Sequence, residues 1–294
     1  MTKERANVFP GQGTHFVGMG NDLKDKSILD DASQSLGFDL ARICSKGPEE
    51  ELRKTENAQP AIFTVSIAKF LEQKGKPSVV AGHSLGEYTA LCAAGVVSFQ
   101  DGLRLVMLRG EYMSQADPES KGTMAAVMGL VQENMAEIRR ICWKNNIIIA
   151  NFNSPEQIVI SGEKKKIGRA SKEIAQMGFK VAELNVSSAF HSPLMAAAGR
   201  KLSQAIASVN VNKPQIPIIF NVSAEYADTP EIIRANLINQ LTQPVLWQKT
   251  IEKMASRGIR EENFIELGPR LVLTPFIRKI FSRFPGRLSR RKKE

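Results

Sequence analysis

The sequence predicts an α/β fold: an α/β-hydrolase-like large domain on a parallel sheet, with a ferredoxin-like small domain inserted into it. Three observations support this prediction. Short apolar segments alternate with helical patterns in the N-terminal part, which is typical of βα units. The pentapeptide Gly82-His-Ser-Leu-Gly86 lies between an apolar strand and a helix, as a nucleophile elbow does. From about residue 122 to 187 the expected order of elements is β-α-β-β-α-β, which is the ferredoxin-like order.

In the first part of the large domain, apolar runs and helical spacing predict two strands and three helices. We expect the strands at residues 7–9 and 78–81, and the helices at 60–74, 85 to about 94, and 99–115. The first strand opens into the glycine loop Gly11-Gln-Gly13. The second strand runs directly into the serine-containing turn, so the turn lies at the carboxyl end of a buried strand.

The small domain is expected to contain four strands and two helices. We place the strands at 123–129, 147–151, 157–161 and 180–186, and the helices at 132–145 and 163–177. The predicted domain bounds follow from this order. They are 1–121 and 188–280 for the discontinuous large domain, 122–187 for the small domain, and 281–294 for a basic tail.

Length and composition indicate an ordinary soluble globular protein. With 294 residues, 43% hydrophobic and 24% charged, the chain can bury a sizeable core. Its longest apolar run, residues 90–97, is too short to cross a bilayer and contains Gly95. The N-terminus lacks the apolar core of a secretion signal, so a cytoplasmic location without a membrane partner is expected.

The three cysteines, Cys44, Cys92 and Cys142, are widely spaced and odd in number. This argues against a disulfide framework and against a Cys/His zinc site, and it fits a reducing compartment. No metal site is predicted.

The formal net charge of +10 is concentrated at the C-terminus. Residues 278–294 hold eight basic residues and one acidic residue, a net +7, which leaves only +3 for the rest of the chain. The body is therefore nearly neutral, and a nucleic-acid partner is not expected. A basic terminus is most often a solvated tail, although docking to an acidic partner, or adhesion to anionic lipid or RNA, stays open.

The chemistry is expected to centre on Ser84. On a tight strand-to-helix turn the residues two before and two after the serine must be small, and both are glycine, Gly82 and Gly86. The free N–H groups of the following helix favour the negative charge that develops when a carbonyl is attacked. The alternative is a glycine-rich turn that happens to contain serine.

A serine hydroxyl needs a base, and the chain offers three histidines, His15, His83 and His191. His83 adjoins Ser84 and is expected to point away from it on a sharp turn. His15 follows the glycine loop, but nothing orients it toward Ser84. His191 lies where the chain returns from the small domain, a place from which it could reach the elbow. From the residues alone, a histidine in a loop is usually an exposed side chain without a catalytic role.

Six motifs give the chain a family resemblance. They are Phe9-Pro-Gly-Gln-Gly13, Gly82-His-Ser-Leu-Gly-Glu87, Arg109-Gly-Glu-Tyr-Met113, Asn153-Ser-Pro-Glu-Gln-Ile-Val-Ile-Ser-Gly162, Ala189-Phe-His-Ser192 and Gln240-Leu-Thr-Gln-Pro-Val245. In this order they resemble the malonyl-CoA:acyl-carrier-protein transacylases. The chain looks closest to the free-standing acyltransferases that serve polyketide synthases without built-in acyltransferase domains. The resemblance covers about residues 7–280 and leaves out the basic tail.

The resemblance implies a role for each motif. Ser84 would be the nucleophile and His191 its base, with the backbone carbonyl of Gln240 orienting the imidazole in place of a carboxylate. The backbone N–H groups of Gln12 and Leu85 would form the oxyanion hole.

The resemblance also implies how the substrate is chosen. Arg109 would bind the free carboxylate of a malonyl group through two parallel hydrogen bonds. The alternative for Arg109 is an ordinary solvated helix arginine like Arg104. Phe190 would favour malonyl over methylmalonyl by crowding the α-carbon. His15 and Ser188 depart from the family pattern and leave the finer selectivity open.

The implied reaction moves a malonyl group from malonyl-CoA to the phosphopantetheine thiol of an acyl carrier protein, through a malonyl-Ser84 ester, in polyketide or fatty-acid biosynthesis. No cofactor is implied, the carrier is expected to be acidic, and a monomer is the default. One alternative is an acyl-carrier-protein thioester hydrolase, which would use the same Ser/His core without a carboxylate clamp. A more distant alternative is a non-catalytic docking subunit of a synthase complex.

Overall fold

The computed structural model describes residues 4–117 and 119–283. One of its two four-stranded sheets has the strand order β7-β2-β1-β8, and all of its pairings are parallel. The strands are β1 (Ala6–Phe9), β2 (Val79–Gly82), β7 (Ile218–Ile219) and β8 (Phe264–Glu266). Strands β1 and β2 lie at the centre and are buried along their whole length, as expected of a parallel sheet covered on both faces.

Alternate side chains of the central strands enter two different cores. Phe9 and Val80 pack in the largest hydrophobic cluster, whereas Val8 and Ala81 pack in a second cluster on the opposite face. Eight helices contribute to the first cluster, α1 (Ser27–Leu36), α2 (Leu40–Lys46), α3 (Glu49–Arg53), α4 (Thr55–Leu71), α5 (Gly86–Ala93), α6 (Phe99–Gln115), α9 (Ala196–Ser208) and α10 (Pro230–Gln240). Helices α11 (Trp247–Ser256) and α12 (Leu273–Arg283) supply the second.

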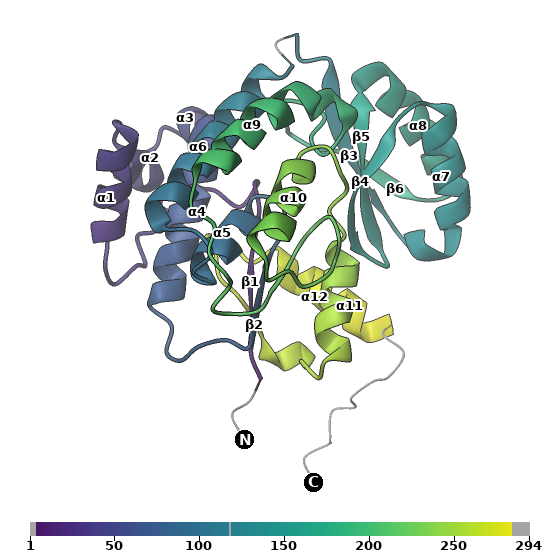
Figure 1. The fold of residues 1–294 in the computed structure, drawn as a ribbon. Helices are drawn as coiled ribbons and strands as arrows, with labels where there is room; N and C mark the ends of the chain where they lie inside the picture. The colour runs from purple at the N-terminus through teal and green to yellow at the C-terminus, as the bar shows by residue number, and fades with distance from the viewer. Residues whose placement is uncertain (1–3, 118, 284–294) are drawn as a thin grey trace.

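The other sheet is antiparallel, with the strand order β4-β5-β3-β6. Its strands are β3 (Gly122–Met128), β4 (Ile148–Ser154), β5 (Gln157–Glu163) and β6 (Lys180–Glu183). Helices α7 (Met135–Lys144) and α8 (Lys164–Gln176) cover its outer face (Figure 1). The chain thus contains one unit built on a parallel sheet and one built on an antiparallel sheet, and the predicted α/β fold class is confirmed.

The two faces of the antiparallel sheet pack differently. Val127 and Ile160 face α7 and α8 in a core of their own, whereas Ala126 and Val159 join the largest cluster of the other unit. The edge strand β4 also bonds across the boundary, because Phe152 N–H donates to the carbonyl of Val245 over 2.9 Å. The antiparallel sheet therefore packs on the core that carries the elbow. That residues 122–187 form a domain of their own stays a prediction.

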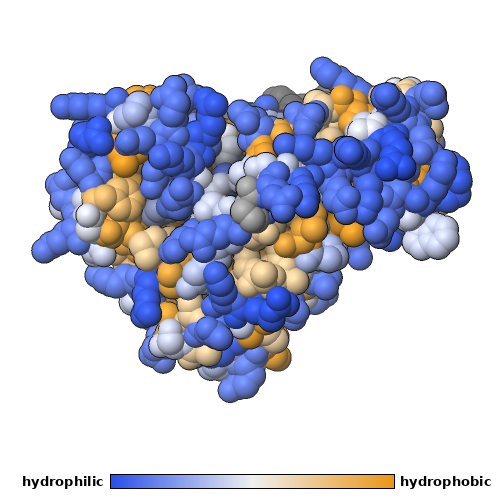
Figure 2. All heavy atoms as spheres, turned by 90° about the horizontal axis from the view of Figure 1, so that it is seen from above, coloured by the Kyte–Doolittle hydropathy of each residue, from blue (hydrophilic) through white to orange (hydrophobic). Residues whose placement is uncertain are grey.

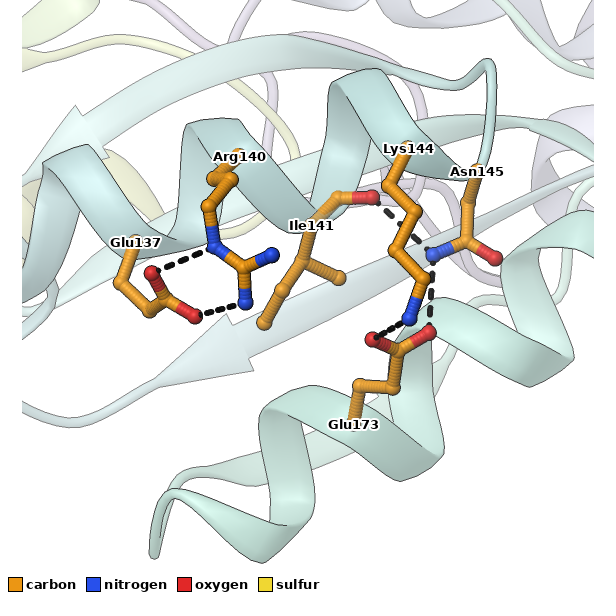
Figure 3. Close-up of polar contacts among 6 residues, drawn as sticks. All are labelled: Glu137, Arg140, Ile141, Lys144, Asn145 and Glu173. Carbon is orange, nitrogen blue, oxygen red and sulfur yellow. Dashed lines mark hydrogen bonds and ion pairs between the residues drawn. The ribbon is translucent and has the colours of Figure 1, made fainter.

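The helices of the small unit are also linked by surface polar contacts (Figure 3). Glu173 on α8 accepts from Lys144 Nζ at 2.9 Å and from Asn145 Nδ2 at 3.1 Å at the end of α7. Arg140 pairs with Glu137 within α7. Exposed pairs of this kind contribute little to stability, because water screens the two charges. Seen from above, the surface is mostly hydrophilic, with hydrophobic side chains in smaller groups between (Figure 2).

Several predicted element bounds were wrong. The helix predicted at 60–74 is α4, which begins at Thr55 and contains Pro60 in its interior. The helix predicted at 132–145 begins with a 3₁₀ turn, Val131–Asn134, before α7. The strand predicted at 180–186 ends at Glu183. The N-terminal helices α1–α3 were not predicted from the sequence, nor was any helix or strand after residue 195.

The predicted basic tail, 281–294, begins inside α12, which includes residues 281–283, and residues 284–294 lie outside the described residues. No helix in the described ranges is long and apolar enough to cross a membrane. Over residues 4–117 and 119–283, no cluster of three or more His, Cys, Asp or Glu side chains could hold a metal ion.

Candidate active site

Ser84 lies on the sharp turn between β2 and α5, in the left-handed backbone region with φ of 53°. This conformation is strained for a non-glycine residue and marks functional turns. A Cβ on Gly82 would lie 1.8 Å from the backbone of Gly86, and one on Gly86 would lie 2.1 Å from the carbonyl oxygen of Phe9. Glycine is therefore required at both positions if Ser84 is to adopt this turn.

The base candidate is in place beside the serine. His191 Nε2 lies 2.7 Å from Ser84 Oγ, and His191 Nδ1 lies 2.9 Å from the backbone oxygen of Gln240. Because a carbonyl only accepts, the Nδ1 atom carries the proton and the Nε2 lone pair faces the hydroxyl. Gln240 is the last residue of α10, where carbonyl groups lack intrahelical partners. The end of a helix thus fixes the tautomer that a general base needs.

Burial keeps this imidazole neutral. His191 is 3% exposed, and burial, with a smaller contribution from the charge of Arg109, lowers the pKa of His191 to about 3. A neutral ring at neutral pH can accept the Ser84 proton.

Arg109 is a buried cation next to the same hydroxyl. It is 1% exposed, whereas Arg104 in the same helix is exposed. Its Nη2 atom donates to Ser84 Oγ at 3.1 Å, and its Nη1 atom donates to Gln59 Oε1 at 2.8 Å. No ion pair found in residues 4–117 and 119–283 includes this guanidinium. The alternative of a solvated helix arginine is therefore wrong.

Comparison with known proteins decides the family. Residues 6–284 match the model of the acyl transferase domain family. The chain belongs to this family.

Relatives of this acyl transferase domain span most of its length. The malonyl CoA-acyl carrier protein transacylase of Bacillus subtilis is 40% identical over 286 residues, which cover 94% of this chain and 90% of that protein. The polyketide biosynthesis malonyl CoA-acyl carrier protein transacylase PksC of Bacillus subtilis is 41% identical, with 93% and 96% covered. The polyketide biosynthesis protein ThaF of Burkholderia thailandensis is 42% identical over 96% of this chain but 24% of that protein.

Solved structures agree with these relatives. An acyl carrier protein S-malonyltransferase from Vibrio cholerae superposes with a TM-score of 0.89 at 38% identity, covering 94% of each chain. A malonyl-transacylase in complex with its type II polyketide synthase acyl-carrier protein gives 0.90 at 39% identity, with 95% of this chain and 94% of that chain covered. The α/β-hydrolase-like fold predicted from the sequence is that of these enzymes.

The predicted oxyanion-hole residues of this acyl transferase domain flank Ser84. Leu85 precedes the first turn of α5, and Gln12 lies in the loop after β1. A Cβ on the adjoining Gly11 would lie 3.6 Å from Ser84 Cβ, so this loop borders the elbow. Within the described ranges, neither backbone N–H donates a hydrogen bond to the protein. Both are available to a ligand, and their role stays a prediction.

Three buried polar residues around the site were missed from the sequence. Asn221 Oδ1 accepts from the backbone N–H of Ser84 at 2.7 Å, and its Nδ2 atom donates to the carbonyl of Gly82 at 2.6 Å. Gln59 holds Arg109, and Glu87 accepts hydrogen bonds from Asn221 and from Gln240. Asn221 follows an apolar run, Ile216 to Phe220, and a polar residue at a strand's carboxyl end was the available signal. Gln59 has no comparable signal.

Among the described residues, the side chains of the other two histidines make no hydrogen bond to Ser84. His83 Nε2 lies 2.8 Å from Asn153 Oδ1, and its ring meets Trp247 edge-on, so it points away as expected. His15 is half-buried, and burial together with the nearby charge of Arg53 lowers its pKa.

The selectivity candidate Phe190 is 6% exposed and belongs to the largest core cluster. Its backbone oxygen accepts from Ser161 Oγ at 2.7 Å, which ties the His191 loop to β5. Ser188 Oγ donates to Asp117 at 3.0 Å. The steric role of the Phe190 ring stays a prediction.

Proposed function

We propose that this chain transfers a malonyl group from malonyl-CoA to the phosphopantetheine thiol of an acyl carrier protein, through a malonyl ester on Ser84. The observation that carries the proposal is a fully buried cation beside a serine–histidine pair. Arg109 Nη2 lies 3.1 Å from Ser84 Oγ, which in turn lies 2.7 Å from His191 Nε2. Such a site suits an acyl group that also bears a carboxylate.

In the first half-reaction, Ser84 Oγ attacks the thioester carbon and its proton moves to His191 Nε2. The carbonyl oxygen becomes an oxyanion, which the N–H groups of Gln12 and Leu85 would stabilise. When the carbon–sulfur bond breaks, the sulfur of CoA leaves with the proton from Nε2. The malonyl group remains as an ester on Ser84.

In the second half-reaction, the thiol of the carrier's phosphopantetheine gives its proton to His191 and attacks the ester. Ser84 leaves and regains that proton. Throughout both halves Arg109 would bind the malonyl carboxylate. Phe190 would crowd the α-carbon and disfavour a methyl branch there.

Gln240 completes the proposed site. Its backbone oxygen accepts from His191 Nδ1–H at 2.9 Å, where a Ser-His-Asp triad has a carboxylate. A carbonyl stabilises the imidazolium less than a carboxylate does. The weaker base suits an enzyme that must hold an ester until the carrier arrives.

The two alternatives have less support. Relatives from Bacillus subtilis and Escherichia coli are named malonyl CoA-acyl carrier protein transacylases, and a hydrolase has no need of a buried guanidinium. A docking subunit has no reason to keep the Ser84–His191 contact. We propose fatty-acid or polyketide biosynthesis as the setting, because relatives from both are similar to the chain.

The remaining features follow from the proposed reaction. The thioester supplies the driving force, so no cofactor is required, and the phosphopantetheine belongs to the carrier. We propose a cytoplasmic monomer that acts on an acidic carrier protein.

The proposal is tested by mixing the full chain with malonyl-CoA and a purified acyl carrier protein in its holo and apo forms. The mass of the holo carrier is expected to increase by one malonyl group, and that of the apo carrier to stay unchanged. Release of free malonate without any malonyl-carrier would overturn transfer and favour the hydrolase.

A further inference from the structure

Glu87 is a fully buried carboxylate in the first turn of α5, three residues after the serine. Its Oε1 atom accepts from the backbone N–H of Asn221 at 2.6 Å. Its Oε2 atom accepts from the side-chain Nε2 of Gln240. The proposed mechanism gives this carboxylate no role, although its burial without an ion pair among residues 4–117 and 119–283 carries a substantial desolvation cost.

The two hydrogen-bond partners of Glu87, Asn221 and Gln240, each bind the backbone of the turn that carries Ser84. Asn221 contacts the backbone N–H of Ser84 and the carbonyl of Gly82. The Nε2 atom of Gln240 also donates to the carbonyl of Ser84 at 3.0 Å. Both backbone polar groups of the nucleophile are thus bound by side chains of residues that donate to Glu87, Asn221 through its backbone N–H and Gln240 through its amide.

Gln240 also reaches the two other functional groups. Its backbone oxygen accepts from His191 Nδ1, and its side-chain Oε1 accepts from Arg109 Nη2 at 3.2 Å. A single residue therefore contacts the nucleophile, the base and the guanidinium, and its amide is oriented by Glu87.

We propose that Glu87 is a positioning residue that sets the amide of Gln240 and thereby holds Arg109 in place for the substrate carboxylate. The inference rests on the proposed function and deepens it.

The direction of the Gln240 amide is the central point. An ionised carboxylate only accepts, so the Gln240 NH₂ group must face Glu87 and its oxygen must face Arg109. A glutamine at position 87 whose oxygen kept the Asn221 N–H would present its own NH₂ group to that of Gln240. The Gln240 amide would then turn and place a donor against the guanidinium, which would lose one of its acceptors.

The ionisation of Glu87 gives the proposal a second readout. Burial raises the pKa of Glu87 to about 7, against the hydrogen bonds from Asn221 and Gln240 and the charge of Arg109. The other titratable groups around this network are Tyr88 and His191, and their pKa values, about 12 and about 3, lie far from neutrality. Protonation near neutral pH would put an O–H group where the network needs an acceptor.

The experiment compares the wild type with Glu87→Gln, Glu87→Asp and the control Glu111→Gln, a half-buried glutamate two residues after Arg109. Stopped reactions read by intact mass give the rates of malonyl and acetyl transfer to Ser84, between pH about 5.5 and about 8.5. Glu87→Gln is expected to lower the malonyl rate roughly tenfold more than the acetyl rate. It is also expected to lose the fall in malonyl rate that the wild type undergoes below pH about 7. Glu87→Asp keeps an acceptor-only group and should retain the malonyl preference.

Equal loss of both rates in Glu87→Gln, or an unchanged pH profile, would overturn the inference. If Glu87→Gln does not fold, Gln240→Met serves instead, because it removes the amide and keeps the backbone carbonyl. It should lose the malonyl preference to the same degree, and an unchanged preference would overturn the inference. A wild type that accepts no acyl group would overturn the proposed function as well. A wild type that accepts malonyl while Glu87→Gln behaves like Glu111→Gln would overturn this inference alone.

Discussion

Arg109 Nη2 donates a hydrogen bond to Ser84 Oγ over 3.1 Å. The reacting hydroxyl and a buried positive charge therefore share one small site. A substrate that uses both must carry an electrophilic carbonyl and an anionic group only a short distance apart. Malonyl thioesters meet this condition because one methylene separates their two carbonyl carbons, whereas an acetyl thioester offers nothing to the guanidinium.

Replacing Arg109 with alanine should therefore lower the rate of malonyl transfer far more than the rate of acetyl transfer. Loss of charge-assisted hydrogen bonds to a carboxylate is expected to lower kcat/KM for malonyl-CoA by roughly 100-fold. The acetyl rate should change much less. Steady-state transfer to a holo carrier measures both, and Arg104→Ala, an exposed arginine of the same helix, is the matched control. An equal loss for both substrates would contradict the proposed clamp.

Replacing His191 with alanine should remove the base and leave the fold. General-base catalysis is worth roughly 10²–10⁴-fold, so the rate of ester formation on Ser84 should fall by a factor in that range. Single-turnover mass spectrometry checks the rate. His15→Ala should remain close to wild type, because in the described part of the chain His15 makes no hydrogen bond to Ser84. A His191→Ala variant that acylates at the wild-type rate would contradict the assigned base.

The lowered pKa of His191 predicts a pH dependence of stability. Because the folded-state pKa is about 3 and the ordinary value is 6.5, the unfolded chain binds the proton more readily between these limits. Stability conferred by the neutral ring is complete above pH 6.5 and is lost as the pH falls toward about 3, by up to about 1.4 kcal/mol per unit.

Urea unfolding at several pH values tests this dependence. The raised pKa of Glu87, about 7, adds a slope of opposite sign from pH 4.5 to about 7, so the wild-type curve alone is not decisive. The difference between wild type and His191→Gln isolates the histidine, and it should shrink as the pH falls. A difference that stays constant with pH would contradict the prediction.

Two glycine-to-alanine changes should shift the stability of the fold in opposite directions. Gly86→Ala places a Cβ 2.1 Å from the Phe9 carbonyl oxygen and should prevent the elbow from forming, with a loss of more than about 3 kcal/mol or no folded protein. Gly168→Ala, exposed in α8 with nothing within 4 Å, should raise stability by about 0.5–1 kcal/mol. Thermal unfolding measures both, and a Gly86→Ala variant as stable as wild type would contradict the steric account.

The sequence predicted the features that depend on local geometry. The elbow follows from two glycines around Ser84, and the antiparallel sheet follows from the β-α-β-β-α-β order of its elements. The family resemblance supplied His191, Gln240 and Arg109, and residue spacing could not have separated Arg109 from Arg104 in the same helix. Burial separates them, and burial depends on α4 and α10, which approach Arg109 from distant parts of the chain.

The contacts that the sequence could not supply are those made by distant segments. Asn221 reaches the Ser84 backbone from the end of β7, and Gln59 reaches Arg109 from α4. The early start of α4 was also hidden, because Pro60 is typical of a first helical turn and lies instead in the helix interior. Pairings of this kind depend on the packed fold, which composition and periodicity do not encode.

The most direct test of the account is the intact mass of the full chain after brief mixing with malonyl-CoA, beside acetyl-CoA and a Ser84→Ala variant. The account predicts a single malonyl adduct that requires Ser84, exceeds any acetyl adduct, and disappears when holo carrier protein is added. An adduct that persists in Ser84→Ala, or a wild type that gains no malonyl group, would contradict it.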